Sequence, residues 1–187
     1  AGGGQLWLRD TQSGTNILVS VDRHGQPAGA AGGFQGVQIS ADGRWVSFMS
    51  DHPDLADGDV NGTVDVFLRD VVAGSTRLVS RSSSTYGRSF GAVLARDASA
   101  VIFRSHATGI ATHGGFWDLY GYSPSEATNR LVSLDITFGS GASGLCDRPV
   151  ISPDGRWLLY RTTAYNVYPE SSAGFEKLVL KNLTVQF

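Results

Sequence analysis

The sequence lacks disulfides, an excess of one charge and long apolar runs. It has a single cysteine, Cys146, so no disulfide forms within the chain. Fifteen basic and 17 acidic residues give a formal net charge of −2, and no run of either sign occurs. This argues against an electrostatic nucleic-acid-binding surface and against a basic membrane-binding surface. No apolar run approaches the roughly 18 residues of a membrane-spanning helix. At 187 residues the chain fits one domain with its own core.

Helix-forming charged residues are also scarce. The chain has only 3 Glu and 2 Lys, beside 14 Asp and 13 Arg. Glycine, in contrast, accounts for 24 residues, about 13% of the chain where about 7% is usual. Glu and Lys favour helices, whereas Gly, Asp and Ser favour turns. The composition therefore predicts an all-β fold of many short strands joined by turns.

One strand-like segment recurs along the chain. The segment 6–10, Leu-Trp-Leu-Arg-Asp, returns as Val-Phe-Leu-Arg-Asp at 66–70 and more loosely at 119–122 and 178–181. Each of the first three copies is followed by a second short strand that ends in Leu-Val-Ser. Such a repeat, with a period between 20 and about 60 residues, is typical of solenoids and propellers.

A hairpin forms the other half of the repeat. Residues 37–48 and 150–160 each carry Ser-(Ala/Pro)-Asp-Gly-Arg-Trp between two apolar stretches, and 93–103 is a degraded copy without the glycine. Asp-Gly indicates a tight hairpin because glycine takes the positive φ of the turn. The strand 45–49 is apolar on both faces, as expected for a sheet packed between two neighbours. Two hairpins in each unit make four strands in about 56 residues, which is typical of a propeller blade.

Three motifs together resemble the TolB-type β-propeller repeat of bacteria: the Ser-(Ala/Pro)-Asp-Gly-Arg-Trp hairpin, the Asp-Val-Phe-Leu-Arg-Asp strand and the Arg-Leu-Val-Ser strand. The resemblance covers essentially the whole chain and implies a β-propeller in a periplasmic or extracellular bacterial protein. It implies no single activity, because propellers host many. We expect about three four-stranded antiparallel blades plus one extra strand, an incomplete propeller, with blade units near 5–36, 37–91, 92–148 and 149–187.

In such a meander, successive connections alternate between the two ends of each sheet. The connections within hairpins are short, so all the longer connections emerge at one end, which we call the long-loop face. They span residues 21–36, 51–64, 81–91, 106–117, 134–148 and 162–176. Because scaffold folds place function on loops, this face is the predicted binding surface. The alternative is that long glycine-rich loops merely tolerate insertion.

One of these loops carries a metal-binding pattern, Asp-Gly-Asp-Val-Asn-Gly-Thr-Val-Asp at 57–65. Oxygen donors alternate along it, with a glycine at the sixth position for the sharp turn. The candidate ligands are Asp57, Asp59, Asn61, Thr63 through its carbonyl oxygen, and Asp65. The twelfth position is Leu68 instead of glutamate, so the loop is no EF-hand and resembles the calcium hairpin loops of integrin-type blades. The sequence predicts one calcium site here, and the alternative is a solvated Asp/Asn/Gly turn.

No catalytic pattern accompanies the loops. Four histidines, His24, His52, His106 and His113, fall in them without the spacing of a zinc site. The sequence has no Gly-x-Ser-x-Gly, Walker or dinucleotide motif, so we assign no catalytic and no organic-cofactor residue. Aromatic residues outside the strands are candidates for stacking on sugars or on partner side chains. They are Phe34, Tyr86, Phe90, Phe116, Trp117, Phe138, Tyr165, Tyr168 and Phe175.

These observations predict a non-catalytic, calcium-binding propeller module that acts as a protein-interaction or scaffold subunit of a larger extracytoplasmic assembly. Two other classes stay open: a glycan-binding propeller that uses the loop aromatics, and a propeller-fold hydrolase or lyase with acids on the long-loop face. Thirteen expected strands make three blades with one strand over, whereas propellers close with four or more blades. We therefore expect a protein partner or further copies of the chain to complete the propeller.

Overall fold

The regular structure of the chain is built from strands. The computed structural model describes residues 4–28, 33–111, 117–135, 140–168 and 175–183, and all regular elements in these residues are β-strands. Thirteen strands lie in this part of the chain, as the repeat predicts. A search of the same residues finds no helix that would cross a membrane.

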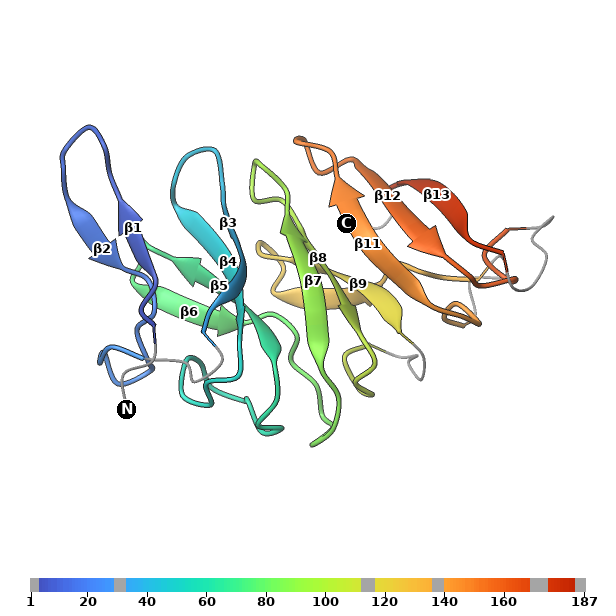
Figure 1. Ribbon diagram of the computed structural model, residues 1–187, viewed down its shortest axis with the longest axis horizontal. Helices are drawn as coiled ribbons and strands as arrows, with labels where there is room; N and C mark the ends of the chain where they lie inside the picture. The colour runs from blue at the N-terminus through green and yellow to red at the C-terminus, as the bar shows by residue number, and fades with distance from the viewer. Residues whose placement is uncertain (1–3, 29–32, 112–116, 136–139, 169–174, 184–187) are drawn as a thin grey trace.

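The strands form four antiparallel sheets, here called blades 1 to 4, which stand side by side (Figure 1). Blade 1 contains β1 (Trp7–Arg9) and β2 (Asn16–Leu18). Blade 2 contains β3 (Gln35–Ile39), β4 (Trp45–Ser50), β5 (Asp65–Asp70) and β6 (Ser75–Leu78). Blade 3 contains β7 (Ser89–Leu94), β8 (Val101–Ser105), β9 (Asp118–Ser123) and β10 (Thr128–Leu131). Blade 4 contains β11 (Cys146–Ile151), β12 (Trp157–Thr162) and β13 (Lys177–Asn182).

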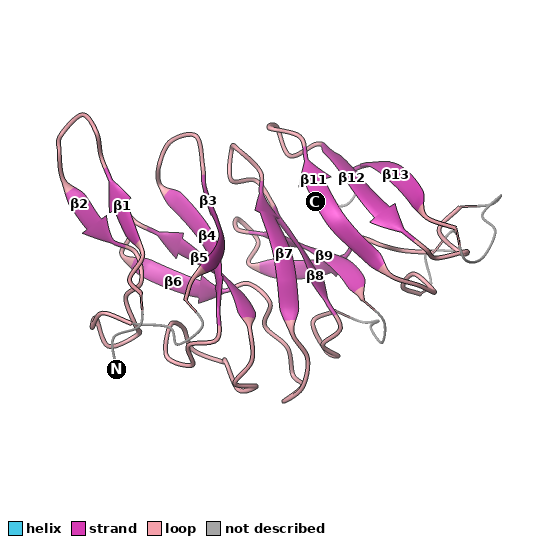
Figure 2. Cartoon of the chain, viewed as in Figure 1, coloured by secondary structure: helices cyan, strands magenta, loops and turns pink. Residues whose placement is uncertain are grey.

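Neighbouring strands in each sheet are also neighbours along the chain, so each blade is a simple meander. Two four-stranded blades stand between a two-stranded and a three-stranded one, which confirms the expected all-β, incomplete propeller (Figure 2). The hairpin turns β1–β2, β3–β4, β7–β8 and β11–β12 lie along the upper edge of Figure 1, and the long β4–β5 and β6–β7 connections lie along its lower edge. The first strands of successive blades, β3, β7 and β11, contact one another and form the inner side of the array.

Apolar side chains fill the spaces between neighbouring blades. Between blades 1 and 2, Phe48 and Phe67 stack with ring centroids 5.7 Å apart. Between blades 2 and 3, Phe103 and Tyr120 stack in the same way at 5.8 Å. Burying an aromatic side chain stabilises the fold by roughly 2–3 kcal/mol. Both faces of blades 2 and 3 are covered, which explains why their strands are apolar without a polar alternation.

A serine hydroxyl joins the last two strands of blades 1, 2 and 3 at the long-loop face. Each hydroxyl accepts a hydrogen bond from the backbone N–H of the residue that begins the repeated strand segment. The pairs are Ser20 with Leu6, Ser80 with Val66 and Ser133 with Leu119, at 2.9–3.0 Å. Each hydroxyl also donates a hydrogen bond to a side-chain oxygen of the residue just before that N–H donor. These acceptors are Gln5 for Ser20, Asp65 for Ser80 and Asp118 for Ser133. We call this arrangement the serine bridge, and it explains why Leu-Val-Ser recurs.

The Asp-Gly hairpins turn as predicted. Gly43 and Gly155 have φ values of 72° and 70°, and the preceding Asp42 and Asp154 each accept a backbone N–H two residues further on. In the degraded copy, Ala98 takes the same left-handed conformation with a φ of 59°. An alanine there costs roughly 1 kcal/mol relative to glycine. The hairpin of blade 3 therefore forms without its glycine because the strands on either side hold it.

Candidate functional site

Four matched backbone positions gather at the long-loop end of the inner strands in blades 2, 3 and 4. Two of them form the last residue pair before a β-bulge between the first and second strands. The third follows in the inner strand and has a positive φ of 57°, 62° and 51° in the three blades. The fourth directly precedes the third strand. Blade by blade, these residues are Gln35, Met49, Gly36 and Val64; Phe90, Arg104, Gly91 and Trp117; and Asp147, Arg161, Arg148 and Glu176.

In blade 2 these positions are structural. Met49 is buried and Val64 packs against the same apolar cluster between blades 2 and 3. Gly36 leaves room for the methionine, because a Cβ there would lie 2.6 Å from the Met49 methyl carbon. No charged group occupies the four positions in this blade.

In blade 3 the same positions hold an arginine among aromatic rings. The guanidinium carbon of Arg104 lies 4.5 Å from the centroid of the Trp117 ring and 6.0 Å from that of Phe90. The two rings are 5.8 Å apart, and the His106 ring lies 4.1 Å from Trp117. Burial, followed by the charges of Arg88 and Arg104, lowers the pKa of His106, which keeps its imidazole neutral near pH 7. Such cation–π contacts are worth about 0.5–2 kcal/mol and fix the guanidinium in place.

In blade 4 the positions are ionic. Asp147 accepts two hydrogen bonds from Arg161, at 2.6 and 2.7 Å, and lies 3.6 Å from a guanidinium nitrogen of Arg104. Arg161 also pairs with Glu176 at 2.6 Å. The hydrogen bonds from Arg161 lower the pKa of Asp147, so this carboxylate stays ionised. An ionised, doubly held carboxylate is suited to ion pairing and to positioning of arginines.

Arg148 stands where blades 2 and 3 have glycine. Its φ of 51° lies in the left-handed region, and its side chain is exposed. A residue with a Cβ costs roughly 1 kcal/mol in this conformation. Arg148 and Arg104 line a cavity of about 350 Å³ between β7 and β11. Non-glycine residues held in such conformations cluster at binding sites, so the position marks this cavity as a candidate site.

The loop aromatics divide into packed and exposed ones. Phe34 packs edge-on against Phe48, with ring centroids 5.6 Å apart, while Phe90 and Trp117 belong to the arginine cluster. The exposed ones are Tyr86, Tyr165, Tyr168 and Phe175. Phe116 and Phe138, like His113, lie outside the described residues.

Three of the five predicted calcium ligands come together in the β4–β5 loop. Asp65 is 1% exposed, and burial raises its pKa to about 6, with the charge of Asp59 adding to the shift. Asn61 lies beside Asp65 and offsets part of that shift. Burial also raises the pKa of Asp59. In the part of the chain that the structure describes, neither Asp59 Oδ2 nor Asp65 Oδ2, both buried, has a hydrogen-bond partner. Two unsatisfied carboxylate oxygens thus lie in one loop.

Asp57 and Thr63 are placed differently. The Asp57 side chain is 84% exposed and pairs with Arg23 at 3.4 Å, so its carboxylate points away from the other ligands. The Thr63 hydroxyl donates to Gly87 O at 2.6 Å. No group of three or more His, Cys, Asp or Glu side chains is placed to hold a metal ion within the described ranges. The cluster therefore offers two carboxylates and one amide oxygen, and the calcium site stays a prediction.

No protein-family model matches the sequence, and no curated protein sequence matches it. Solved structures are similar in fold. Tricorn protease has a TM-score of 0.56 at 11% identity, covering 95% of this chain and 15% of that one. The putative TolB from Agrobacterium tumefaciens has a TM-score of 0.54 at 14% identity, covering 100% and 54%. The β-propeller domain of the trilobed protease from Pyrococcus furiosus has a TM-score of 0.53 at 12% identity, covering 96% and 47%.

The chain thus spans about half, or less, of the length of these proteins. Identities below 20% show a shared fold and carry no activity from one protein to the other. The blades, the hairpin turns and the structural neighbours agree on one architecture, and the chain has the fold of a TolB-like β-propeller.

Proposed function

We propose that this chain is a propeller binding module without catalysis of its own, and that it holds a protein partner on the long-loop face. One observation carries the proposal: four matched positions change from uncharged side chains and glycine in blade 2 to Phe90, Arg104 and Trp117 in blade 3, and to charged side chains in blade 4. Aromatic residues and arginine are the side chains that dominate binding energy at protein interfaces. The shared backbone does not require them, since blade 2 folds without them.

Arg148 adds to this support. Glycine at the same position in two blades shows what the backbone prefers, so the arginine is retained despite a conformational cost. Its exposed guanidinium and that of Arg104 together favour a partner segment that carries a carboxylate. Exposed tyrosines on the surrounding loops, such as Tyr165 and Tyr168, extend the surface with further side chains typical of interfaces.

Site-specific photo-crosslinking tests the proposal. A benzophenone amino acid replaces Arg148, and a matched control replaces Val72, which is exposed on the β5–β6 turn at the opposite end of blade 2. We expect one discrete crosslinked protein from position 148 in the native host and none from position 72. Equal crosslinking at both positions, or none at 148, contradicts the proposal. A glycan array probed with wild type and with Tyr165→Ala tests the glycan-binding class. Sugar binding by wild type that is lost in the variant would support that class instead.

We also propose that calcium binds in the β4–β5 loop through Asp59, Asn61 and Asp65. The two buried carboxylate oxygens without partners support it, because a cation offsets both their repulsion and their desolvation. Calcium takes six to eight oxygen ligands and accepts backbone carbonyls and water, so the Thr63 carbonyl and solvent complete the set. Extracellular modules of this kind bind with dissociation constants of about 10⁻⁴ to 10⁻³ M. Such a site fills only outside the cytoplasm, in keeping with the location that the TolB resemblance implies.

Melting temperatures in calcium and in chelator test this site. Calcium at about 100 times its dissociation constant adds roughly 2.7 kcal/mol to the unfolding free energy. We expect this gain in wild type and in Asp118→Asn, and its loss in Asp59→Asn and Asp65→Asn. Asp118→Asn is the matched control, since Asp118 holds the equivalent place in blade 3. No gain in wild type, or an equal gain in all the variants, overturns the site.

A third proposal concerns the outer face of blade 4. Leu178 and Leu180 of β13 are 73% and 64% exposed, and Leu159 and Val150 lie beside them in register on β12 and β11. An apolar sheet face of this kind marks an interaction surface. In blade 3 the matching side chains of Ile102 and Leu119 are fully buried under blade 4. We propose that a further β-blade, from a protein partner or another copy of the chain, covers blade 4 in the same way.

Native mass spectrometry distinguishes the two sources. We expect an assembly heavier than the 19.9 kDa of the chain, and the Leu178→Ser, Leu180→Ser double variant should release the single chain. A multiple of the chain mass identifies further copies, and a different added mass identifies a partner. A soluble, cooperatively folding species with the mass of one chain overturns this proposal while leaving the long-loop face untouched.

A further inference from the structure

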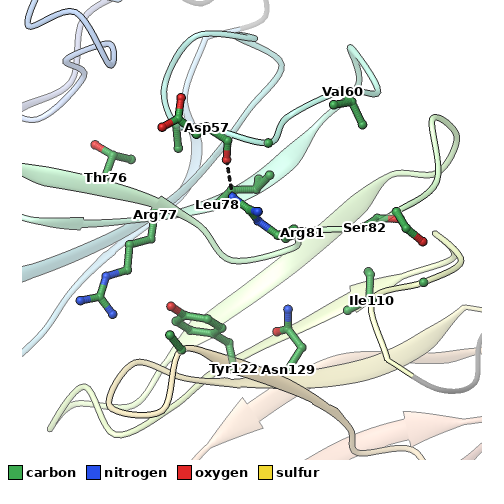
Figure 3. A pocket seen from close by; sticks show the side chains of 15 residues that line it. Asp57, Val60, Thr76, Arg77, Leu78, Arg81, Ser82, Ile110, Tyr122 and Asn129 are labelled. Atoms are coloured by element: carbon green, nitrogen blue, oxygen red, sulfur yellow. Dashed lines mark hydrogen bonds between the residues drawn. The ribbon is translucent and has the colours of Figure 1, made fainter.

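A groove opens between the outer strands of blades 2 and 3, away from the inner strands that carry the arginine cluster. Its volume is about 960 Å³, and β6, β9 and β10 line it together with four connecting segments. Figure 3 shows Arg77 and Arg81 reaching in from blade 2, and Tyr122, Asn129 and Ile110 reaching in from blade 3. Pockets of about 300–1,000 Å³ are typical of ligand sites.

The two arginines are held in place without a carboxylate partner. Nη2 of Arg81 donates to the carbonyl oxygen of Asp57 at 2.8 Å, and its guanidinium lies against Gly58, where a Cβ would come within 2.7 Å of Nη2. Nη1 of Arg77 donates to Pro124 O at 2.8 Å. Neither arginine forms an ion pair with a described carboxylate within 4.0 Å, and each has five donors. Both arginines line the groove, and the Arg77 guanidinium is held in addition over the Trp45 ring, 5.5 Å from its centroid.

Asn129 adds an acceptor of fixed orientation. Its Nδ2 donates to the carbonyl oxygen of Val79 at 2.8 Å, which turns Oδ1 the other way. That oxygen is buried and has no partner among the described residues. A buried acceptor without a donor costs about 1–3 kcal/mol. A ligand whose N–H reaches this oxygen, after a small shift of its neighbours, would remove that cost.

The walls of the groove are preformed. The Ser82 hydroxyl donates to Thr108 O, which ties the loop after β6 to the loop after β8. Gly109 packs so closely on Ser83 that a Cβ there would lie 2.0 Å from the serine oxygen. Rigid sites bind more tightly because little ordering accompanies binding.

We propose that this groove binds an extended peptide segment in which an acidic side chain neighbours an apolar one. The carboxylate pairs with Arg81, a backbone N–H donates to Asn129 Oδ1, and the apolar side chain packs on the buried Ile110 and Leu78. A simple anion would satisfy the arginines and leave the Asn129 acceptor unmet. An apolar ligand would desolvate both cations without pairing them, so the combined chemistry favours a peptide.

Selection from a phage-displayed library of random dodecapeptides on immobilised wild-type protein provides the probe. Enriched sequences are synthesised, and their affinities are measured by fluorescence polarisation. We expect enriched peptides to combine Asp or Glu with Leu, Ile or Phe. Arg81→Gln and Asn129→Leu should each weaken binding at least tenfold, which corresponds to about 1.4 kcal/mol.

Arg9→Gln is the matched control for the loss of a surface arginine, since Arg9 is exposed on β1 in blade 1. It should bind the peptides like wild type. Arg81 is exposed, so we expect Arg81→Gln to keep the fold. If Asn129→Leu lowers the melting temperature, the affinity of Arg81→Gln alone tests the proposal. Failure to enrich any peptide overturns the proposal. Equal affinity for wild type and Arg81→Gln overturns it as well, and neither outcome bears on the proposed partner site around Arg148.

Discussion

Blades 2 and 3 place an aspartate at the same point and surround it differently. Asp65 and Asp118 each begin the third strand, are each 1% exposed and each accept a serine hydroxyl. Asp118 also accepts the backbone N–H of Ala142 at 3.1 Å, whereas Asp65 lies beside Asp59 and keeps one oxygen without a partner in the described structure. The shared role is structural, and of these two aspartates only Asp65 has a buried oxygen without a partner among the described residues. The loop around a repeated position therefore decides the environment of its carboxylate.

The largest expected effect comes from removing the serine hydroxyl that binds each aspartate. Ser133→Ala and Ser80→Ala each leave a backbone N–H and a carboxylate oxygen unsatisfied in a buried place, and we expect losses of about 3 kcal/mol in unfolding free energy. Ser20→Ala should lose about 1 kcal/mol, because its bridge in blade 1 is only partly buried. Urea unfolding of the three variants measures this. Similar losses below 1 kcal/mol in all three would show that the serine bridge is not structural.

The next test compares how Asp65 and Asp118 contribute to the pH dependence of the unfolding free energy. The pKa of Asp65 in the folded protein is about 6, above its ordinary value, so the protonated form favours folding. Its contribution to stability is complete below about pH 4 and is lost as the pH rises through 6. In chelator, wild type should therefore be more stable at pH 5 than at pH 7.5 by about 1–2 kcal/mol from this group. Asp65→Asn should remove that increment.

Asp118→Asn is the companion variant. Burial raises the pKa of Asp118, but the Ser133 hydroxyl and the N–H of Ala142 oppose the shift and no aspartate adds to it, so removal of this carboxyl should alter the pH dependence less. Urea unfolding at the two pH values measures the difference for both variants. An identical pH dependence in wild type and Asp65→Asn would contradict the burial of an ionisable Asp65.

The fold was predictable because its determinants are local and repeated. Apolar strands, Asp-Gly turns and Leu-Val-Ser endings recur at similar spacing. The turns and the serine bridges form within one blade, and the apolar strands pack between neighbouring blades. The site was less predictable because its parts come from distant segments. Asp57 fits the calcium pattern by sequence, yet Arg23, 34 residues earlier, draws its carboxylate away. Nothing in the local sequence indicates that partner.

The arginine cluster and the groove were missed for the same reason. Arg104 lies on β8, Trp117 directly precedes β9 and Asp147 lies on β11 in the next blade, and no spacing rule relates them. One indication was present: Gly36 and Gly91 hold equivalent positions in β3 and β7, and β11 of blade 4 has Arg148 at that point. Alignment of the repeats by strand register, instead of by motif, reveals this replacement.

A smaller effect tests whether the glycine position is strained. Gly91 has a φ of 62° and open space around it, so Gly91→Ala meets no clash and reports only the backbone conformation. We expect a loss of about 1 kcal/mol in unfolding free energy. Gly36→Ala should lose more, because its Cβ would also press on Met49. Equal stability of Gly91→Ala and wild type would show that the left-handed conformation is not maintained.

The smallest expected effect on stability comes from replacing Arg148 in blade 4 with glycine, the residue that blades 2 and 3 have at this position. Arg148→Gly relieves the left-handed strain, roughly 1 kcal/mol, and adds chain entropy to the unfolded state, about 0.4–1 kcal/mol. The two nearly cancel, so we expect the unfolding free energy to stay within about 0.5 kcal/mol of wild type. Asp147 keeps its bidentate pair with Arg161, so the ionic cluster should persist. Affinity for a partner identified by crosslinking should nevertheless fall, because the exposed guanidinium is gone. A stability loss above 1 kcal/mol with unchanged partner affinity would instead assign Arg148 to the fold, and the matched positions would then differ in packing alone.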